Sequence, residues 1–272
     1  WNQMLDLIHL TGMEKSMKNQ YQNASNISSR IRLHKEYSTN SKGWFPWIFE
    51  QCHMENHSNV LEIGCGDGSL WLENKEKIPE QLHVVLSDIS EGMLRDTRMI
   101  HSNIQNARFD FQVFDCERIP YPNDSFDLII ANHVLFYCKH LTDVFQEIAR
   151  VLKPNGVFIC STYGSEHMKE INELVSEFDD RIILSAERLF ERFGKENGAD
   201  LLAPYFHNIT WLPYEDSLYV TEPETLISYV LSCHGNQNQY IIDHYKEFRN
   251  YVRKKTEHGF NITKDAGIFI TI

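Results

Sequence analysis

Three glycines at alternate positions follow a short apolar run near residue 60. Residues 60–68 read VLEIGCGDG, and an amphipathic stretch comes after them. Glycine lets the backbone turn sharply and lets a ligand approach the main chain, while the first turn of a helix offers free N–H donors. The pattern therefore predicts a ligand-binding turn between a strand and a helix.

Two acidic residues at the ends of the next two predicted strands extend this site. Asp88 lies 20 residues after Gly68, where a carboxylate can accept hydrogen bonds from both hydroxyls of a ribose. Asp115 follows the next strand, and open α/β sheets bind ligands at the carboxyl ends of their strands. A carboxylate there can accept from the exocyclic amine of adenine, so these segments together predict a nucleoside site.

The chain between residues 59 and 163 alternates short apolar runs with amphipathic stretches, which is typical of βαβ units. Strands are predicted at 60–63, 83–87, 109–114, 126–131 and 157–161. The nearly continuous apolar run at 126–131 predicts a strand buried on both faces. Apolar residues at helical spacing predict a helix over 141–152, which the KPNG sequence at 153–156 ends.

The segments on either side of this core have a different character. Residues 1–57 are polar, with helices expected at about 25–37 and from Trp44 onward. Residues 164–272 predict helices over 166–200, 223–232 and 240–257, and extended segments at 209–213, 217–221 and 267–272. We interpret the helical parts of 164–272 as insertions that cap one end of the sheet, together with its last strands, rather than as a separate domain.

Composition excludes several classes of protein. The 272 residues contain 26 Lys plus Arg against 38 Asp plus Glu, and the net charge of −12 argues against a nucleic-acid partner. No stretch reaches the ~18 apolar residues of a membrane span. The six cysteines, without a CxxC pair, predict reduced thiols and a cytoplasmic location. The sequence contains no HExxH-like spacing of the kind that would predict a metal site.

Four segments of residues 58–163 resemble, in the right order, the motifs of class I S-adenosylmethionine-dependent methyltransferases. They are EIGCGDG at 62–68, SDIS at 87–90 with the following helix, residues 114–129, and EIARVLKPNGV at 147–157. The resemblance implies a Rossmann-like, doubly wound, seven-stranded, mostly parallel α/β sheet with an α-helical cap. It implies S-adenosyl-L-methionine as cofactor and S-adenosyl-L-homocysteine as product. The alternatives are a nicotinamide dehydrogenase, which G-x-G-x-G spacing disfavours, and a non-catalytic nucleotide-binding protein.

The resemblance also implies roles for the residues of the glycine turn. Gly64, Gly66 and Gly68 would pass under the methionine part of the cofactor. Glu62 would anchor this loop, which includes Cys65, through the amino group of the methionine or a water molecule.

At the adenosine end, the resemblance assigns the side chains that follow the second and third strands. Asp88 would hold the ribose, and Ile89 and Met93 would flank the adenine. Asp115 with Cys116 would meet the amine edge of the adenine.

Further contacts to the methionine end are expected from two other segments. Asn132, just past the fourth strand, would reach the cofactor through its backbone carbonyl. The N-terminal segment resembles leaders that fold over the cofactor, and Arg30, His34 or Tyr37 could meet the cofactor carboxylate. The alternative for this segment is a solvated helix.

The acceptor side indicates a small molecule. Methyl transfer requires alignment of a nucleophile ~3 Å from the methyl group and exclusion of water, with a base only for a nucleophile of high pKa. Residues 132–135 read NHVL and lack the [DNS]-P-P-[YF] pattern of enzymes that methylate exocyclic amines. We expect transfer to an O, N or C nucleophile of a small molecule, with an RNA or protein methyltransferase as the alternative.

Trp44 and Trp47, in the N-terminal segment, are expected to anchor the core and not to contact the acceptor.

Five residues are candidates for contact with the acceptor. His133, at the end of the fourth strand, could take a proton from the acceptor; the alternative is a histidine at a polar rim or a helix cap. Tyr137, Tyr163, His167 and Trp211 could bind or orient the acceptor.

Overall fold

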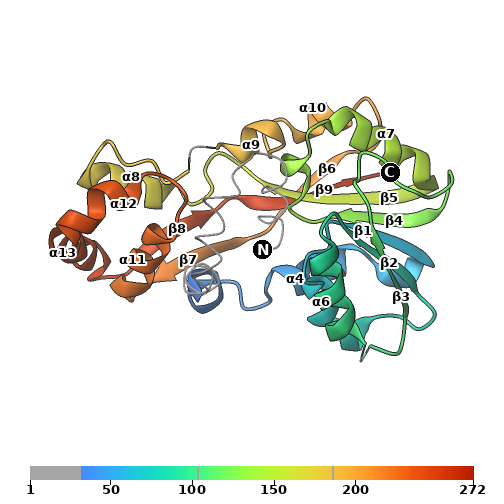
Figure 1. The fold of residues 1–272 in the computed structure, drawn as a ribbon, viewed down its shortest axis with the longest axis horizontal. Helices are drawn as coiled ribbons and strands as arrows, with labels where there is room; N and C mark the ends of the chain where they lie inside the picture. Colours follow the sequence, from blue (N-terminus) through green and yellow to red (C-terminus); the bar gives the residue numbers. More distant parts are fainter. Residues whose placement is uncertain (1–31, 103, 186) are drawn as a thin grey trace.

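The structure, a computed structural model, describes residues 32–102, 104–185 and 187–272. Its main element is a seven-stranded sheet in the order β3-β2-β1-β4-β5-β9-β6 (Figure 1). The strands are β1 (Asn59–Ile63), β2 (His83–Asp88), β3 (Arg108–Val113), β4 (Phe126–Ala131), β5 (Leu152–Tyr163), β6 (Thr210–Pro213) and β9 (Ala266–Thr271). Strands β1 to β5 pair in parallel, and β9 runs antiparallel between β5 and β6. The predicted seven-stranded, mostly parallel sheet is confirmed.

Helices cover both faces of this sheet, because its central strands are apolar on both sides. Val60 of β1 belongs to one buried cluster and its neighbour Leu61 to the other. The helices on the first face are α4 (Trp44–Gln51), α5 (Ser69–Leu72) and α6 (Glu91–His101). The second face is covered by α7 (Leu141–Val151), α9 (Leu189–Arg192) and α10 (Gly198–Leu202). The doubly wound arrangement follows from this two-sided burial.

Helix α7 ends one residue before its predicted end, and strand β5 follows it directly, five residues before the predicted start at 157. The helix buries Val144, Phe145 and Ile148, as its helical spacing predicts. Strand β5 begins at Leu152, so the KPNG segment belongs to the strand and does not form a separate turn. Asn155 adopts a left-handed backbone with φ of 64°, and the pairing of β4 with β5 shifts register there.

The cap is a second lobe with its own small sheet. Strands β7 (Asp216–Val220) and β8 (Phe260–Lys264) pair antiparallel, next to β6 and β9 along the chain. Helices α8 (Lys169–Phe178), α11 (Pro223–Leu231), α12 (Gln237–Ile241) and α13 (Tyr245–Thr256) surround this sheet at the end opposite β1–β4 (Figure 1). Leu226, Phe248 and Ile262 lie in a separate apolar cluster. The cap therefore has a core of its own, which the sequence interpretation did not include, and β8 was not predicted.

Short 3-10 helices complete the described chain: η1 (Met54–Asn56), η2 (Lys75–Lys77), η3 (Leu135–Tyr137) and η4 (Ile242–His244). Residues 32–37 are helical, within the predicted helix at 25–37, and Leu33 is buried in the apolar cluster of the cap. Helix α4 begins at Trp44 as predicted. Within the described ranges, no helix combines the length and the apolar character needed to cross a membrane.

Candidate functional site

The glycine loop joins β1 to α5 and is fastened to the end of β2. Gly64, Gly66 and Gly68 have φ values of 63°, 56° and 71°, a region that glycine adopts without the steric cost of a side chain. The N–H of Gly66 donates to Asp88 Oδ2 at 3.1 Å. A Cβ on Gly68 would lie 2.1 Å from His101 Cε1. The three glycines therefore create a turn, of which Gly64 and Gly66 form part of a cavity wall.

A cavity of about 60 Å³ lies beside this loop at the ends of β2 and β3. The predicted nucleoside residues Asp88, Ile89, Asp115 and Cys116 all line it. The Asp88 carboxylate is buried and also accepts from the N–H of Ser90 at 2.9 Å. We call this space the nucleoside cavity, because its acidic residues are those expected for ribose and adenine.

Two predicted residues of this region lie in other places than the sequence suggests. Met93 lies in the first turn of α6, where its N–H donates to Oγ of the N-cap residue Ser90 at 3.3 Å. It is not among the described residues that line the nucleoside cavity. Tyr137 does line this cavity, because the short helix η3 turns it toward the ends of β1 and β2. We therefore place Tyr137 on the nucleoside side and not with the acceptor.

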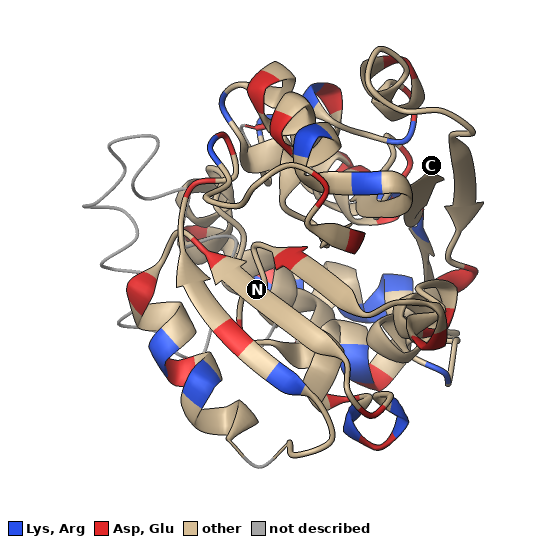
Figure 2. Cartoon of the chain, turned by 90° about the vertical axis from the view of Figure 1, so that its right-hand side faces the viewer, with Lys and Arg blue, Asp and Glu red and all other residues tan. Residues whose placement is uncertain are grey.

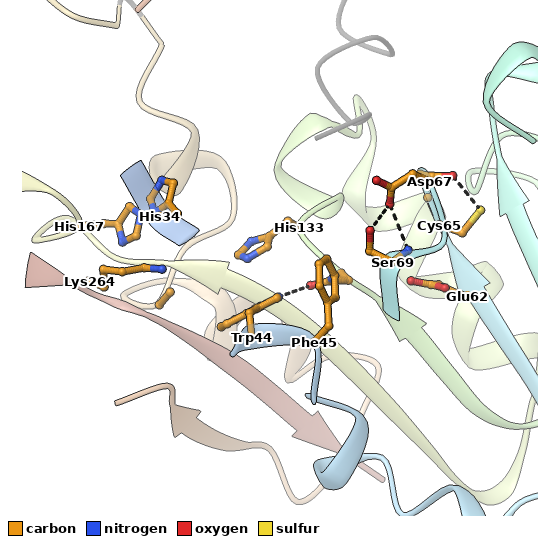
Figure 3. A pocket seen from close by; sticks show the side chains of 14 residues that line it. His34, Trp44, Phe45, Glu62, Cys65, Asp67, Ser69, His133, His167 and Lys264 are labelled. Atoms are coloured by element: carbon orange, nitrogen blue, oxygen red, sulfur yellow. Dashed lines mark hydrogen bonds between the residues drawn. The ribbon is translucent and has the colours of Figure 1, made fainter. Parts of the chain in front are cut away.

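A larger cavity of about 340 Å³ adjoins the nucleoside cavity at Gly64, the one described residue that lines both. Glu62, Gly66 and Asn132 also face it, as do the loop residues Cys65 and Asp67 (Figure 3). We call it the central cavity. It brings together Glu62, Gly64, Gly66 and Asn132 of the residues predicted for the methionine end, while the predicted Gly68 lines neither of these two cavities.

Glu62 is a buried carboxylate in the wall of the central cavity. Its Oε2 accepts a hydrogen bond from Trp71 Nε1 at 2.7 Å. Burial raises the pKa of Glu62 to about 8, because a charged form is poorly solvated in the interior. A cation bound in the cavity would stabilise the ionised form, so Glu62 is suited to meet a positively charged group.

The end of β4 presents a bonded group of side chains to the same cavity. Asn132 Oδ1 accepts from Trp44 Nε1 at 3.2 Å and from Ser161 Oγ at 2.7 Å. His133 stacks on Trp44 with ring centroids 4.8 Å apart and has a left-handed backbone with φ of 52°. Such strain in a non-glycine residue is common at functional sites. Trp44, expected only as a core anchor, therefore lines the cavity and positions His133.

The electrostatic environment keeps His133 neutral. Burial lowers the pKa of His133 to about 3, since the imidazolium form would lose its hydration. The ring is therefore uncharged near pH 7 and retains a nitrogen that can accept a hydrogen bond.

A third cavity, of about 610 Å³, lies between the sheet and the cap. We call it the cap chamber. It meets the central cavity at His34 and His167, which line both. Tyr163 lines the chamber as well, and burial raises its pKa to about 12, so its hydroxyl stays protonated. The predicted acceptor residues Tyr163 and His167 thus lie in one chamber that opens onto the central cavity.

Other predicted contacts lie elsewhere. Trp211 packs on Phe269 in the core, with ring centroids 4.7 Å apart, and lines none of the three cavities. The hydroxyl of Tyr37, predicted to meet the cofactor, lies 3.4 Å from Thr225 Oγ1 at the cap, and Tyr37 lines none of the three cavities. Arg30 lies outside the described residues. The sequence analysis missed Lys264, which lines the central cavity from the unpredicted strand β8.

One group of three possible metal ligands occurs among the described residues. Glu117, His140 and Asp143 have ligand atoms within 4.8 Å of one another. His140 Nδ1 lies 2.9 Å from Glu117 Oε2, and His140 and Asp143 are exposed. The pair is an ordinary surface ion pair, in which Glu117 raises the pKa of His140.

We expect Gly64→Ala to lower cofactor affinity about tenfold and the free energy of unfolding by about 1–3 kcal/mol. The new Cβ would lie 2.7 Å from Val134 Cγ2 at a φ of 63°. Adding Val134→Ala should restore part of both losses. Gly92→Ala is the control, because its new Cβ would come no closer than 3.9 Å to its nearest neighbour, Ser90 Oγ. Calorimetric titration and thermal unfolding measure these effects, and an unchanged affinity for Gly64→Ala would contradict the placement of the ligand over this residue.

The chain resembles known proteins mainly over its α/β core. Residues 61–160 match the family model described as "Methyltransferase domain". A malonyl-[acyl-carrier protein] O-methyltransferase of Methylovorus sp. (strain MP688) is 33% identical over 131 residues, 46% of this chain and 44% of that protein. A demethylmenaquinone methyltransferase of Symbiobacterium thermophilum is 30% identical over 121 residues, 43% of this chain and 48% of that protein. The chain thus matches about half the length of these relatives.

A solved structure has the same fold. The YcgJ protein of Bacillus subtilis superposes with a TM-score of 0.55 at 17% identity, over 84% of this chain and 97% of that protein. At this identity the similarity establishes the arrangement of the elements. The family match to residues 61–160 covers the glycine loop and every described residue that lines the nucleoside cavity, whereas the central cavity is also lined by residues outside the match, among them Trp44 and Lys264.

Proposed function

We propose that this chain is a class I S-adenosylmethionine-dependent methyltransferase, which transfers a methyl group from S-adenosylmethionine to a small molecule and releases S-adenosylhomocysteine; the match of residues 61–160 to the methyltransferase-domain model supports this. The observation that supports this proposal is the order of the three cavities. The nucleoside cavity meets the central cavity at Gly64, and the central cavity meets the cap chamber at His34 and His167. The three neighbouring cavities would hold the adenosine group of the cofactor, its sulfonium and the acceptor, which is the order of these groups in a methyl-transfer complex.

The residues of the two inner cavities fit the cofactor. When bound, S-adenosylmethionine supplies a methyl group on a sulfonium that is already activated for displacement. In the proposed complex, Asp88 accepts from the ribose hydroxyls, Asp115 accepts from the adenine amine, and Glu62 faces the positive charge. The protein's own contribution is alignment and exclusion of water.

A small-molecule acceptor is favoured by the cap chamber and by the distribution of charge. The chamber is lined by residues of both lobes, in keeping with sites that enclose a partly apolar ligand. In Figure 2, Lys and Arg alternate with Asp and Glu along the same helices, which does not favour a nucleic-acid acceptor. The family match ends at residue 160, before the cap, so the acceptors named for the relatives are not assigned to this chain. Six cysteines without a disulfide favour a cytoplasmic location.

Calorimetric titration with S-adenosylmethionine, S-adenosylhomocysteine and NAD tests the proposal. We expect micromolar affinity for the first two and no heat with NAD. Binding of NAD without either sulfur nucleoside would replace the methyltransferase with a nicotinamide enzyme. Binding of the sulfur nucleosides would be followed by a metabolite screen for transfer of a labelled methyl group.

We further propose that His133 orients the acceptor and accepts its proton. His133→Ala should leave the affinity for S-adenosylhomocysteine unchanged and slow turnover about 100-fold. Because its pKa is about 3, protonation of His133 should not reduce the rate between pH 8 and pH 5 at saturating cofactor. His140→Ala, an exposed histidine after the same strand, is the control. Wild-type turnover in His133→Ala would exclude the role.

A further inference from the structure

Three polar side chains meet at the end of the central cavity that lies away from the glycine loop (Figure 3). His34 comes from the helical residues 32–37, His167 from the turn before α8, and Lys264 from the end of β8. We call these residues the His–Lys cluster. Because His34 and His167 also line the cap chamber, the cluster stands at the boundary between the proposed cofactor and acceptor spaces.

Both imidazoles of the cluster have a buried nitrogen without a hydrogen-bond partner in the described chain. These atoms are His34 Nδ1 and His167 Nδ1. Burial, reinforced by Lys264, lowers the pKa of both residues to about 3, so both rings are neutral and each has one N–H to donate. A buried polar atom left without a partner costs about 1–3 kcal/mol. Two such atoms beside one cavity are available to a hydrogen-bonding group bound there.

Lys264 adds a positive charge beside these rings. Its Nζ lies 3.1 Å from Asp216 Oδ2, and the side chains are 13% and 1% exposed. The other carboxylate oxygen of Asp216 accepts from Ser38 Oγ at 2.7 Å and from the N–H of Asn40 at 3.1 Å. Asp216 is thus shared among several donors, while the ammonium of Lys264 has three protons and faces the cavity.

The remaining charges of the central cavity lie at its other end. Glu62 and Asp67 belong to the glycine-loop side, and His133 separates them from the cluster (Figure 3). Lys264 is the one charged residue at its own end among the described residues that line this cavity. The site therefore combines the ammonium donors of Lys264, which Asp216 pairs with from outside the cavity lining, with two neutral hydrogen-bonding rings, and this set of donors suits an anion with several acceptor lone pairs.

We propose that the His–Lys cluster binds a carboxylate of the methyl acceptor, whose apolar part extends into the cap chamber. The inference rests on the proposed methyltransferase function and names its substrate class. A carboxylate accepts hydrogen bonds at two oxygens and can meet Lys264, His34 and His167 together. The chamber supplies an apolar wall for the rest of the molecule: Tyr163, Met168, Ile171, Ile182, Leu184 and Phe190.

The carboxylate could also come from the methionine part of the cofactor. Position favours the acceptor, since the methionine part is expected over the glycine loop, at the opposite end of the central cavity. His34 and His167 line the cap chamber, which the cofactor does not need. The experiment below distinguishes these sources.

Calorimetric titration of the wild-type protein, saturated with S-adenosylhomocysteine, tests the chemistry of the site. The probes are octanoate, octanol and octylamine, which share one chain and differ in the charge of the head group. We expect octanoate to bind at least about tenfold more tightly than either of the others, because only it satisfies the cluster. Equal affinities, or no binding of octanoate at millimolar concentration, would overturn the proposal. This comparison requires no variant.

Substitution of Lys264 then locates the site. Lys264→Met should weaken octanoate binding at least about tenfold and leave S-adenosylhomocysteine binding unchanged, while Lys264→Arg should retain most of the affinity for octanoate. Lys195→Met is the matched control, since Lys195 forms a similar pair with Asp265, 2.7 Å apart, and lines none of the three cavities. Wild-type octanoate affinity in Lys264→Met would overturn the assignment.

The cofactor itself provides the last comparison. 5′-Methylthioadenosine lacks the amino-acid part of S-adenosylhomocysteine. If Lys264→Met weakened binding of S-adenosylhomocysteine but not of 5′-methylthioadenosine, the cluster would hold the cofactor carboxylate, and the acceptor assignment would be wrong. If the wild type bound neither nucleoside, the proposed function would fail, which is a different result from selective loss of octanoate binding.

Discussion

Asp88→Ala is expected to weaken S-adenosylmethionine binding about 100-fold, a loss of about 3 kcal/mol. The carboxylate is 2% exposed and accepts from the N–H groups of Gly66 and Ser90. It also lines the nucleoside cavity, where it is proposed to accept from the ribose hydroxyls. The substitution removes these ribose bonds and leaves the loop N–H without its acceptor, so binding and loop geometry are lost together. Titration calorimetry measures the loss directly.

Asp127→Ala is the matched control for this experiment. Asp127 also accepts from two backbone N–H groups, those of Ser58 at 3.1 Å and Asn59 at 2.8 Å. It lies near the start of β4 and lines none of the three cavities. Its loss should lower the free energy of unfolding and leave cofactor affinity intact. If both variants lost affinity equally, the effect of Asp88 would be on folding and not on the ribose.

The sheet and the residues at its glycine loop could be predicted, because each is specified by a short stretch of neighbouring residues. Strands buried on both faces are mostly apolar, so β1 and β4 can be recognised in the sequence, as can the amphipathic helix between β4 and β5. The glycines at 64, 66 and 68 are required by left-handed backbone angles, and Asp88 and Asp115 lie at strand ends by topology. Each of these features is specified within a few residues of the chain.

The acceptor side was less predictable because it is assembled from distant segments. His34, His167 and Lys264 are separated by more than 90 residues at each step, and no local spacing links them. Strand β8 reads FNITK, with only Ile262 fully buried, so it gives little hydrophobic periodicity. Trp211 was misassigned for the converse reason, since an aromatic residue on an edge strand looks the same whether it packs on Phe269 or lines a chamber.

Glu62→Gln is expected to change stability and cofactor binding in opposite directions. The pKa of Glu62 is about 8 in the folded protein against 4.5 for the free side chain. Between these values the unfolded chain releases the proton while the folded chain keeps it, so the stability of the wild type falls as pH rises from about 4.5 to about 8. Glutamine has no proton to release, and it can still accept from Trp71. Near pH 8 the unliganded variant should therefore be more stable than the wild type, by a few kcal/mol.

Binding of S-adenosylmethionine should show the reverse order. The positively charged cofactor favours ionised Glu62, so the wild type should release a proton on binding at pH 7, and its affinity should rise with pH until about pH 8. Glu62→Gln should bind about 100-fold more weakly at pH 8 and release no proton at this site. Titration in buffers of different ionisation enthalpy measures the proton count. Glu73→Gln is the control, because burial also raises the pKa of Glu73 but its side chain lines none of the three cavities. If Glu62→Gln kept wild-type affinity and wild-type proton release, Glu62 would not contact the cofactor charge. Its burial would then affect only the stability of the fold.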